Sequence, residues 1–530
     1  MPDTQRLMVL AIDAASPALL KRWTADGTLP NLARLEARGL RGDLAAIWPF
    51  HTGSTWPSFY TGCNPAQHGI YWLQQLQTGS YRTRAMGAAE FGRRKALWET
   101  LSDAGHDVLV LDVPLSRLSP ALRGRQVVEW CSHDAIFGLQ TMPSELATRI
   151  LTTIGNHPAP APCDAAHRTL AEYQHFAGEL VHGATSRARL TRMLMADAPW
   201  DFAIQVFNEA HCAGHQLWHF HDPHHPAFDP AVEAVSGDLL RSAYVAIDAA
   251  IGAVVADARP DTTIVVVTLH GMSHYTGYSR LLPAILTGLG ASTPRGSEQP
   301  AASLTIGERF TRAVRTIYHL IPESIRRPFY EFRAEVGTRV LNRDTPLPID
   351  PKRSRCFHAD MGPLVGGIRL NLIGREPLGT LARGSEADAF SDELTAQLLE
   401  LVDPDTKQPI VRRVLRTREL FDGEYLEDLP DLLVEWDLSR PVGSSAVGDG
   451  AASTIQAFSP RVGLLTLANA YCRTGEHTPE GMFIACGPGI APGQLDRIVL
   501  TLDLAPTFSA LLGVEMTGVD GSVIPELLGR

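Results

Sequence analysis

The hydroxyl of Thr55 stands in a segment suited to nucleophilic chemistry, Gly53-Ser54-Thr55-Trp56-Pro57-Ser58. Pro57 follows two positions after Thr55, and proline is tolerated in the first turn of a helix because its missing N–H has no partner there. The segment therefore predicts a loop that delivers Thr55 to the start of a helix. The N–H groups and dipole of a helix N-terminus suit a phosphoryl or sulfuryl oxygen. An ordinary helix N-cap explains the same residues. The choice between a nucleophile and a cap therefore depends on residues elsewhere in the chain.

Two histidines four residues apart form a second candidate. His211 and His215 follow the apolar run 202–207, and one turn of helix would put both imidazoles on one face, a common arrangement for ligands of one metal ion. Such pairs also occur by chance. Four more histidines follow in a run rich in His, Asp and Pro that we expect to lie at the surface: His219, His221, His224 and His225.

Three further polar residues stand beside apolar runs. Asp13 follows the run 7–12, His270 follows a β-branched run that ends at Thr268, and His477 lies in a turn-forming stretch before another apolar run. Open α/β sheets bind ligands beyond the carboxyl ends of their strands, so we expect these side chains to converge with the threonine and the histidine pair. The alternative role of Asp13 is to cap the helix predicted for residues 17–26. Imidazole and carboxylate ligands around a hydroxyl suit Zn²⁺, which would lower the pKa of that hydroxyl.

The elements that must position these residues alternate along the chain. Buried strands are predicted for the apolar runs 7–12, 107–114, 200–207, 261–268, 367–372, 432–436 and 481–489. Helices are predicted for residues 17–26, 95–104, 231–257 and 502–512, and after Thr55. Strands that alternate with helices imply right-handed crossovers and a mostly parallel sheet, so the predicted fold class is α/β.

Composition excludes several other classes of protein. The 530 residues carry a net charge of −11 without a block of like charges, which argues against binding of a nucleic-acid polymer. No stretch approaches the roughly 18 apolar residues of a membrane span. The run 7–12 is too short for a signal sequence, so we expect a cytoplasmic protein. Seven scattered cysteines without C-x-x-C spacing predict reduced thiols rather than disulfides or a thiolate zinc site.

Together, these stretches resemble the alkaline phosphatase superfamily, and within it the type I phosphodiesterase/nucleotide pyrophosphatase family. The residues that carry the resemblance are Asp13, Thr55-Trp56-Pro57-Ser58 with Thr61-Gly62, His68-Gly69-Ile70, Gly214-His215, His270-Gly271-Met272, His477 and Asp503-Leu504-Ala505-Pro506-Thr507. The resemblance implies an alkaline-phosphatase-like sandwich, in which helices flank a mostly parallel central sheet. It also implies a catalytic core made of residues 1–272 and 361–530, with residues 273–360 as an inserted linker and helical cap.

The resemblance further implies a two-metal site beside a nucleophile. In this family the residue that matches Thr55 is the nucleophile and bridges two metal ions. His215 and His477 match ligands of the first metal, and Asp13 and His270 match ligands of the second.

Two positions of this chain depart from the family pattern. His211 and Leu269 stand where the family has aspartates. We therefore expect a first site of three imidazoles (His211, His215 and His477) and a weaker second site that depends on Asp13, His270 and the Thr55 oxygen. Glu209 is a candidate extra ligand. Zn²⁺ is the expected ion, as one or two ions, with Mn²⁺ as the second option.

These expectations predict a metal-dependent phosphoric ester hydrolase that forms a covalent phospho-Thr55 intermediate on a small phosphate ester substrate. A non-catalytic or specialised binding relative is the alternative, favoured by the lost carboxylate at Leu269. A sulfatase fits less well, because its C/S-x-P-x-R motif is not matched around Thr55. Trp72 and Arg82 are candidate substrate contacts. Substrate identity, preference for monoesters or diesters, and oligomeric state stay open.

Overall fold

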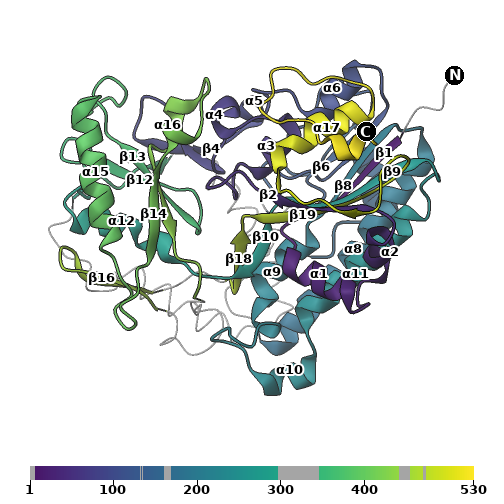
Figure 1. Ribbon diagram of the computed structural model, residues 1–530, viewed down its shortest axis with the longest axis horizontal. Helices are drawn as coiled ribbons and strands as arrows, with labels where there is room; N and C mark the ends of the chain where they lie inside the picture. Colours follow the sequence, from purple (N-terminus) through teal and green to yellow (C-terminus); the bar gives the residue numbers. More distant parts are fainter. Residues whose placement is uncertain are drawn as a thin grey trace.

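A mixed sheet runs through the centre of the protein (Figure 1). The computed structural model describes residues 6–131, 133, 135–159, 169–296, 345–440, 454–468 and 473–529. Within these ranges the strand order is β20-β2-β19-β9-β1-β8-β5-β6-β7, with β21 paired to β2. The strands are β1 (Arg6–Ile12), β2 (Leu40–Ala45), β5 (Val108–Leu111), β6 (Gly124–Val128), β7 (Gln140–Met142), β8 (Phe202–Phe207), β9 (Thr262–Thr268), β19 (Glu480–Cys486), β20 (Gly493–Gln494) and β21 (Val499–Leu500).

The central strands are buried on both faces, as their continuous apolar runs predict. Alternate side chains of a strand point to opposite faces, so β1 contributes to two separate cores. Met8 and Leu10 face one core and Leu7 and Val9 face the other. The first core is covered by α1 (Pro17–Ala25), α2 (Pro30–Glu36), α8 (Leu170–Asp197) and α11 (Leu239–Val255), and the second by α3 (Thr55–Thr61), α6 (Leu97–Asp103) and α17 (Leu504–Leu511).

Strand direction brings several polar segments to one edge of the sheet. β1 pairs in parallel with β8 and with β9, so Ile12 lies beside Phe207 and Ala11 beside Val267. The residues that follow these three strands therefore start at the same edge. β19 runs antiparallel to β9, so the segment that precedes it starts there too. That segment is β18 (Gly475–Thr478), which pairs with β10 (Gly271–His274) and sets His477 opposite Met272.

A smaller antiparallel sheet lies beside the central sheet, at the left of Figure 1. It has the order β12-β13-β15-β14, with β12 (Cys356–Ala359), β13 (Val365–Leu370), β14 (Val411–Arg416) and β15 (Leu432–Trp436). α12 (Leu282–Gly288) and α15 (Ser385–Leu399) pack on it and form a further hydrophobic core. The predicted boundary at residue 360 falls between β12 and β13, which pair with each other. The division into a catalytic core and an inserted cap stays a prediction, and residues 297–344 of that cap lie outside the described residues.

The predicted α/β class with a mostly parallel central sheet is confirmed. The single helix predicted for 231–257 is wrong, because two helices occupy this range, α10 (Pro230–Ser236) and α11. Gly237 between them has a φ of +70°, and the Asp238 carboxylate accepts a hydrogen bond from the Arg241 backbone N–H to start the second helix. In the described ranges, no helix is long and apolar enough to cross a membrane.

Candidate functional site

His211 and His215 lie one turn apart on α9 (Glu209–Leu217) and face each other. Their Nε2 atoms are 2.9 Å apart. The other nitrogen of each ring is already committed, because His211 Nδ1 lies 2.6 Å from Asp13 Oδ2 and His215 Nδ1 lies 2.8 Å from the Gly475 carbonyl oxygen. Both oxygens only accept, so both Nδ1 atoms carry the proton and donate. When both rings are neutral, two Nε2 lone pairs point at each other, and a cation bound between them would remove the repulsion.

His477 and His133 complete a cluster of buried imidazoles. The ring of His477 lies 4.8 Å from the rings of both His211 and His215. The ring of His133 lies 4.5 Å from His211 and 5.4 Å from His215. The structure thus brings together the three imidazoles expected for the first site and adds a fourth. Sequence reasoning missed His133 because it lies in the loop after β6, a strand that the apolar pattern did not predict.

Glu476 supplies a buried carboxylate that the sequence analysis also missed. Its Oε1 lies 4.0 Å from His215 Nδ1 and 3.7 Å from His477 Nε2. Arg473 lies on the other side, with Nη1 3.4 Å from Glu476 Oε2 and Nη2 donating to His133 Nε2 at 2.9 Å. A carboxylate therefore does lie beside the imidazoles, although the two aspartates that His211 and Leu269 replace are absent. The sequence signal that could have identified Glu476 is its position directly before His477.

Asp13 joins the imidazoles to the helix that begins at Thr55. Its Oδ1 accepts a hydrogen bond from Trp56 Nε1 at 2.9 Å, and its Oδ2 accepts from His211 Nδ1. Burial raises the pKa of Asp13, but His211, His270 and Trp56 outweigh this effect and leave the pKa below its usual value. The N-cap residue of α1 is Ser16, so the carboxylate serves the site rather than that helix.

His270 lies beside Asp13, with Nε2 3.9 Å from Oδ1. Its ring is also 4.7 Å from the ring of His477. Burial lowers the pKa of His270 to about 4, although the Asp13 charge opposes this shift. The ring is therefore neutral at pH 7 and keeps a lone pair.

Thr55 is the first residue of α3, as predicted, and it is fully buried. Its hydroxyl donates to the backbone carbonyl of His51 at 2.6 Å. The neighbouring Trp56 reaches Asp13, which ties the start of this helix to the edge of the sheet that carries the imidazoles. The helix ends at Gly62, whose φ of +68° is the left-handed conformation that closes many helices.

Glu209 is committed to a different buried network. Its Oε1 accepts hydrogen bonds from Arg187 Nε and His157 Nε2, both at 2.9 Å. Arg187 also donates from Nη1 to Asp112 Oδ2 at 2.6 Å. Burial raises the pKa of Glu209, but the charges of Arg187 and His157 outweigh it and lower the pKa to about 2. These hydrogen bonds therefore hold Glu209 at the start of α9, and its carboxylate belongs to this network rather than to the imidazole cluster.

The two candidate substrate contacts lie in segments that follow α3, and the Trp72 backbone lies against Gly53. Trp72 packs over Gly362, and Arg82 is exposed on β4 (Arg82–Ala85), so their role in substrate binding stays a prediction. The surface placement expected for His219 and His225 is wrong, because both are buried. The ring of His219 packs against Tyr173 of α8, which covers this turn.

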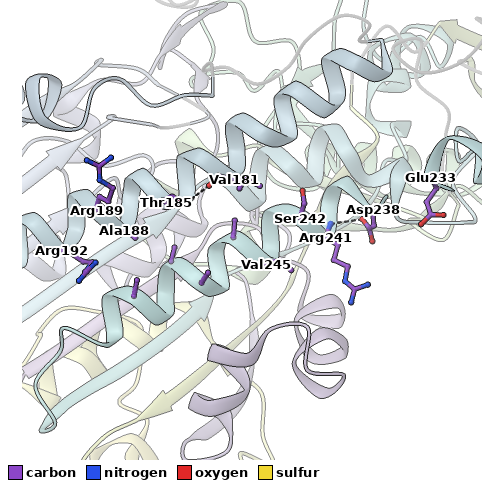
Figure 2. Close-up of a pocket in the computed structure, with 14 residues that line it drawn as sticks. Val181, Thr185, Ala188, Arg189, Arg192, Glu233, Asp238, Arg241, Ser242 and Val245 are labelled. Carbon is purple, nitrogen blue, oxygen red and sulfur yellow. Dashed lines mark hydrogen bonds between the residues drawn. The ribbon is translucent and has the colours of Figure 1, made fainter. Parts of the chain in front are cut away.

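A groove of about 800 Å³ lies between α8 and α11 on the outside of the protein (Figure 2). It is lined by small and apolar side chains, including Ala188 and Val245, with Arg189 and Arg192 along one side. None of the residues that line this groove belongs to the imidazole cluster, so it is separate from the candidate site.

The fold and these groups define an α/β enzyme whose polar site lies at the strand ends. Residues 7–286 match the family model described as Type I phosphodiesterase / nucleotide pyrophosphatase, and the chain belongs to this family. The family that the sequence motifs indicated is thereby confirmed, and the protein is a hydrolase of phosphoric ester bonds. The matched span contains Asp13, Thr55, His211, His215 and His270.

Solved structures of similar shape extend over nearly the whole chain. Murine ectonucleotide pyrophosphatase/phosphodiesterase 5 is 11% identical with a TM-score of 0.45, and the match covers 98% of each chain. Phosphonoacetate hydrolase from Sinorhizobium meliloti 1021, in complex with phosphonoacetate, is 14% identical with a TM-score of 0.49, and the match covers 95% of this chain and 94% of that one. No curated protein matches the sequence.

Replacing Glu209 by Gln is predicted to destabilise the protein by about 3–5 kcal/mol at pH 7, because it breaks a buried ion pair. The folded pKa of about 2 lies below the ordinary 4.5, so the carboxylate contributes stability above pH 4.5 and loses it as the pH falls toward 2. Urea unfolding at pH 7 and at pH 3 measures both effects. The exposed Glu393→Gln is the matched control, and equal stability of the two variants would contradict the prediction.

Proposed function

We propose that this protein is a metal-dependent phosphoric ester hydrolase in which the Thr55 hydroxyl attacks the phosphorus of a small phosphate ester. The observation that carries this proposal is the facing pair of His211 and His215. Each ring has its Nδ1 hydrogen held by an oxygen and its Nε2 directed at the other ring. Histidines that bind metal are oriented in this way, by a carboxylate or a carbonyl on the second nitrogen.

The donor set fits a divalent cation that prefers nitrogen. His211, His215 and His477 would hold it. The ligand atoms of His133, His211 and His215 lie within 4.8 Å of one another, and so do those of His215, Glu476 and His477. Burial, together with the positive charge of Arg473 and neighbouring imidazoles, lowers the pKa of His215 well below its usual value, so the ring stays neutral and available. Imidazole ligands suit Zn²⁺, whereas Mn²⁺ prefers oxygen. Bound here, such a cation would supply Lewis acidity toward phosphoryl oxygens and a hydroxyl.

The chain's own residues supply the nucleophile and its orientation. The His51 carbonyl oxygen accepts a hydrogen bond from the Thr55 hydroxyl and so fixes the rotamer of this side chain. In the proposed reaction the bond from Thr55 Oγ1 to phosphorus forms in line as the bond from phosphorus to the leaving oxygen breaks, and the proton of the Thr55 hydroxyl ends on the leaving alcohol. Water then cleaves the phospho-Thr55 ester and restores the hydroxyl. Asp13 holds the start of α3 and His211 in fixed relation during both steps.

A binding protein without catalysis is the second candidate, and Leu269 favours it. This side chain is buried in the apolar core directly before His270 and offers no ligand atom. A site with few carboxylates neutralises two divalent cations poorly. Turnover therefore separates the two candidate functions.

Thr55→Ala is predicted to lower turnover of para-nitrophenyl phosphate or its bis-ester by at least about 1,000-fold, because it removes the nucleophile. The zinc content, measured by elemental analysis, is expected to stay unchanged. Thr55→Ser keeps a hydroxyl and is the matched control that retains measurable turnover. Undiminished turnover by Thr55→Ala would remove this residue from the mechanism.

His215→Ala is predicted to strip the metal, since it removes one of the two facing nitrogens. Elemental analysis of chelator-washed and zinc-reloaded protein measures the loss. His224→Ala, which removes an exposed histidine nearby in the sequence, is expected to keep the wild-type zinc content. Equal zinc in both variants would show that the imidazole cluster is not a metal site.

A panel of esters tests the class of reaction. With Zn²⁺ or Mn²⁺ present, we expect turnover of a phosphate monoester or diester and none of a sulfate ester. Turnover of the sulfate ester alone would favour a sulfatase, and no turnover of any ester would favour the binding protein.

A further inference from the structure

Glu476 is a fully buried carboxylate that lies against two imidazoles of the cluster. It stands on β18, which packs against α9 (Figure 1). Its Oε1 lies 3.7 Å from His477 Nε2 and 4.0 Å from His215 Nδ1. Within the described part of the chain, the donor atoms of His215, Glu476 and His477 form a group within 4.8 Å that could hold a metal ion. Neither the nucleophile nor its orientation accounts for this carboxylate.

The spacing of Glu476 and His477 suits two ligands of one zinc ion. Bonds of about 2.0–2.2 Å in tetrahedral geometry place two donor atoms about 3.3–3.6 Å apart. The 3.7 Å between Glu476 Oε1 and His477 Nε2 is close to this range, so a small movement of the side chains would bring both atoms onto one ion. His215 would bind through Nε2, because its Nδ1 hydrogen is donated to the Gly475 carbonyl oxygen.

Arg473 and the main chain hold the carboxylate in place. Arg473 Nη1 lies 3.5 Å from Glu476 Oε1 and 3.4 Å from Oε2. The backbone N–H of His477 donates to Oε1 at 3.1 Å. A carboxylate offers about four lone pairs, so Glu476 can accept these bonds and still bind a cation. Metal ligands in proteins are commonly oriented by such outer hydrogen bonds.

A carboxylate ligand also balances the charge of the first site. Neutral imidazoles from His211, His215 and His477 would leave a buried divalent cation with its full charge, and a buried charge is costly unless it is compensated. His211 stands where the family has an aspartate. A carboxylate from β18 would therefore restore the negative charge that this position no longer supplies.

We propose that Glu476 is a ligand of the cation that His211, His215 and His477 hold. This inference rests on the proposed function and adds one oxygen donor to its three imidazoles. A set of histidines with one glutamate is typical of zinc in hydrolases. The alternative role of Glu476 is to neutralise Arg473 without touching the cation, and the experiment separates these two roles.

Two variants test the assignment by zinc affinity, measured in competition with a chromogenic chelator. Glu476→Gln removes the charged oxygen but leaves the Arg473 charge, which would itself weaken zinc binding by repulsion. The double variant Arg473→Gln/Glu476→Gln removes both charges and so keeps the net charge of the site. We expect both variants to bind zinc at least about 10-fold more weakly than the wild type, since loss of an outer partner of a ligand already costs that much. The visible absorption of the Co²⁺-loaded protein is expected to change in both variants, because the set of ligands changes.

Wild-type zinc affinity in the double variant would show that Glu476 only neutralises Arg473, and would overturn the assignment. Wild-type affinity in Glu476→Gln would overturn it as well. Either result leaves the imidazole site and the proposed function intact, whereas absence of zinc from the wild-type protein would overturn both proposals. If Glu476→Gln does not fold by circular dichroism, the double variant decides alone, because it leaves no buried charge unpaired.

Glu376→Gln is the matched control. Glu376 is also a buried glutamate that pairs with arginines, accepting hydrogen bonds from Arg369 Nε and Arg375 Nε, both at 2.9 Å. It follows β13 of the smaller sheet, and we expect its variant to keep the wild-type zinc affinity. An equal loss of affinity in this control would reveal an effect of general destabilisation and would overturn the assignment of Glu476.

Discussion

The parallel pairing of β1 with both β8 and β9 is the constraint on which the site depends. Parallel strands end at one edge, so Asp13, the start of α9 and His270 emerge side by side although they are far apart in the sequence. The antiparallel β19 starts at that edge and brings His477 with it. Apolar side chains on both faces of these strands fix the register, because a slip of one residue would exchange the two cores. Burial of the sheet therefore positions the polar groups.

The same burial determines the charge of the site. Burial lowers the pKa of His215, His270 and His477, so these imidazoles present lone pairs rather than positive charges. Among the carboxylates, Asp13 contributes by orientation, since it holds His211 and Trp56, and Glu476 lies between Arg473 and two of the rings. A cation bound among such ligands keeps more of its charge than one bound by several carboxylates. This property suits the stabilisation of phosphoryl oxygens.

The sequence predicted the parts of this arrangement that follow from strand ends. Asp13, His270 and the pair on α9 come directly after apolar strands, so their convergence follows from one general rule about α/β sheets. His133 and His51 lie in loops, where no periodicity shows which way a side chain points, and only burial in the folded chain distinguishes them. The break between α10 and α11 had a signal in Gly237 followed by Asp238, a glycine and an N-cap residue inside a helical pattern. The apolar periodicity of residues 231–257 continues across Gly237, so it predicts one helix instead of two.

The hydrogen bond from Trp48 Nε1 to Glu435 Oε2 couples two parts of the fold that are far apart in the sequence. It joins the smaller sheet to the ring against which His51 stacks. Glu435 also pairs with Arg412 and Arg413 of β14, so loss of the Glu435 carboxylate would release both these arginines and the Trp48 ring that the imidazole stacks on.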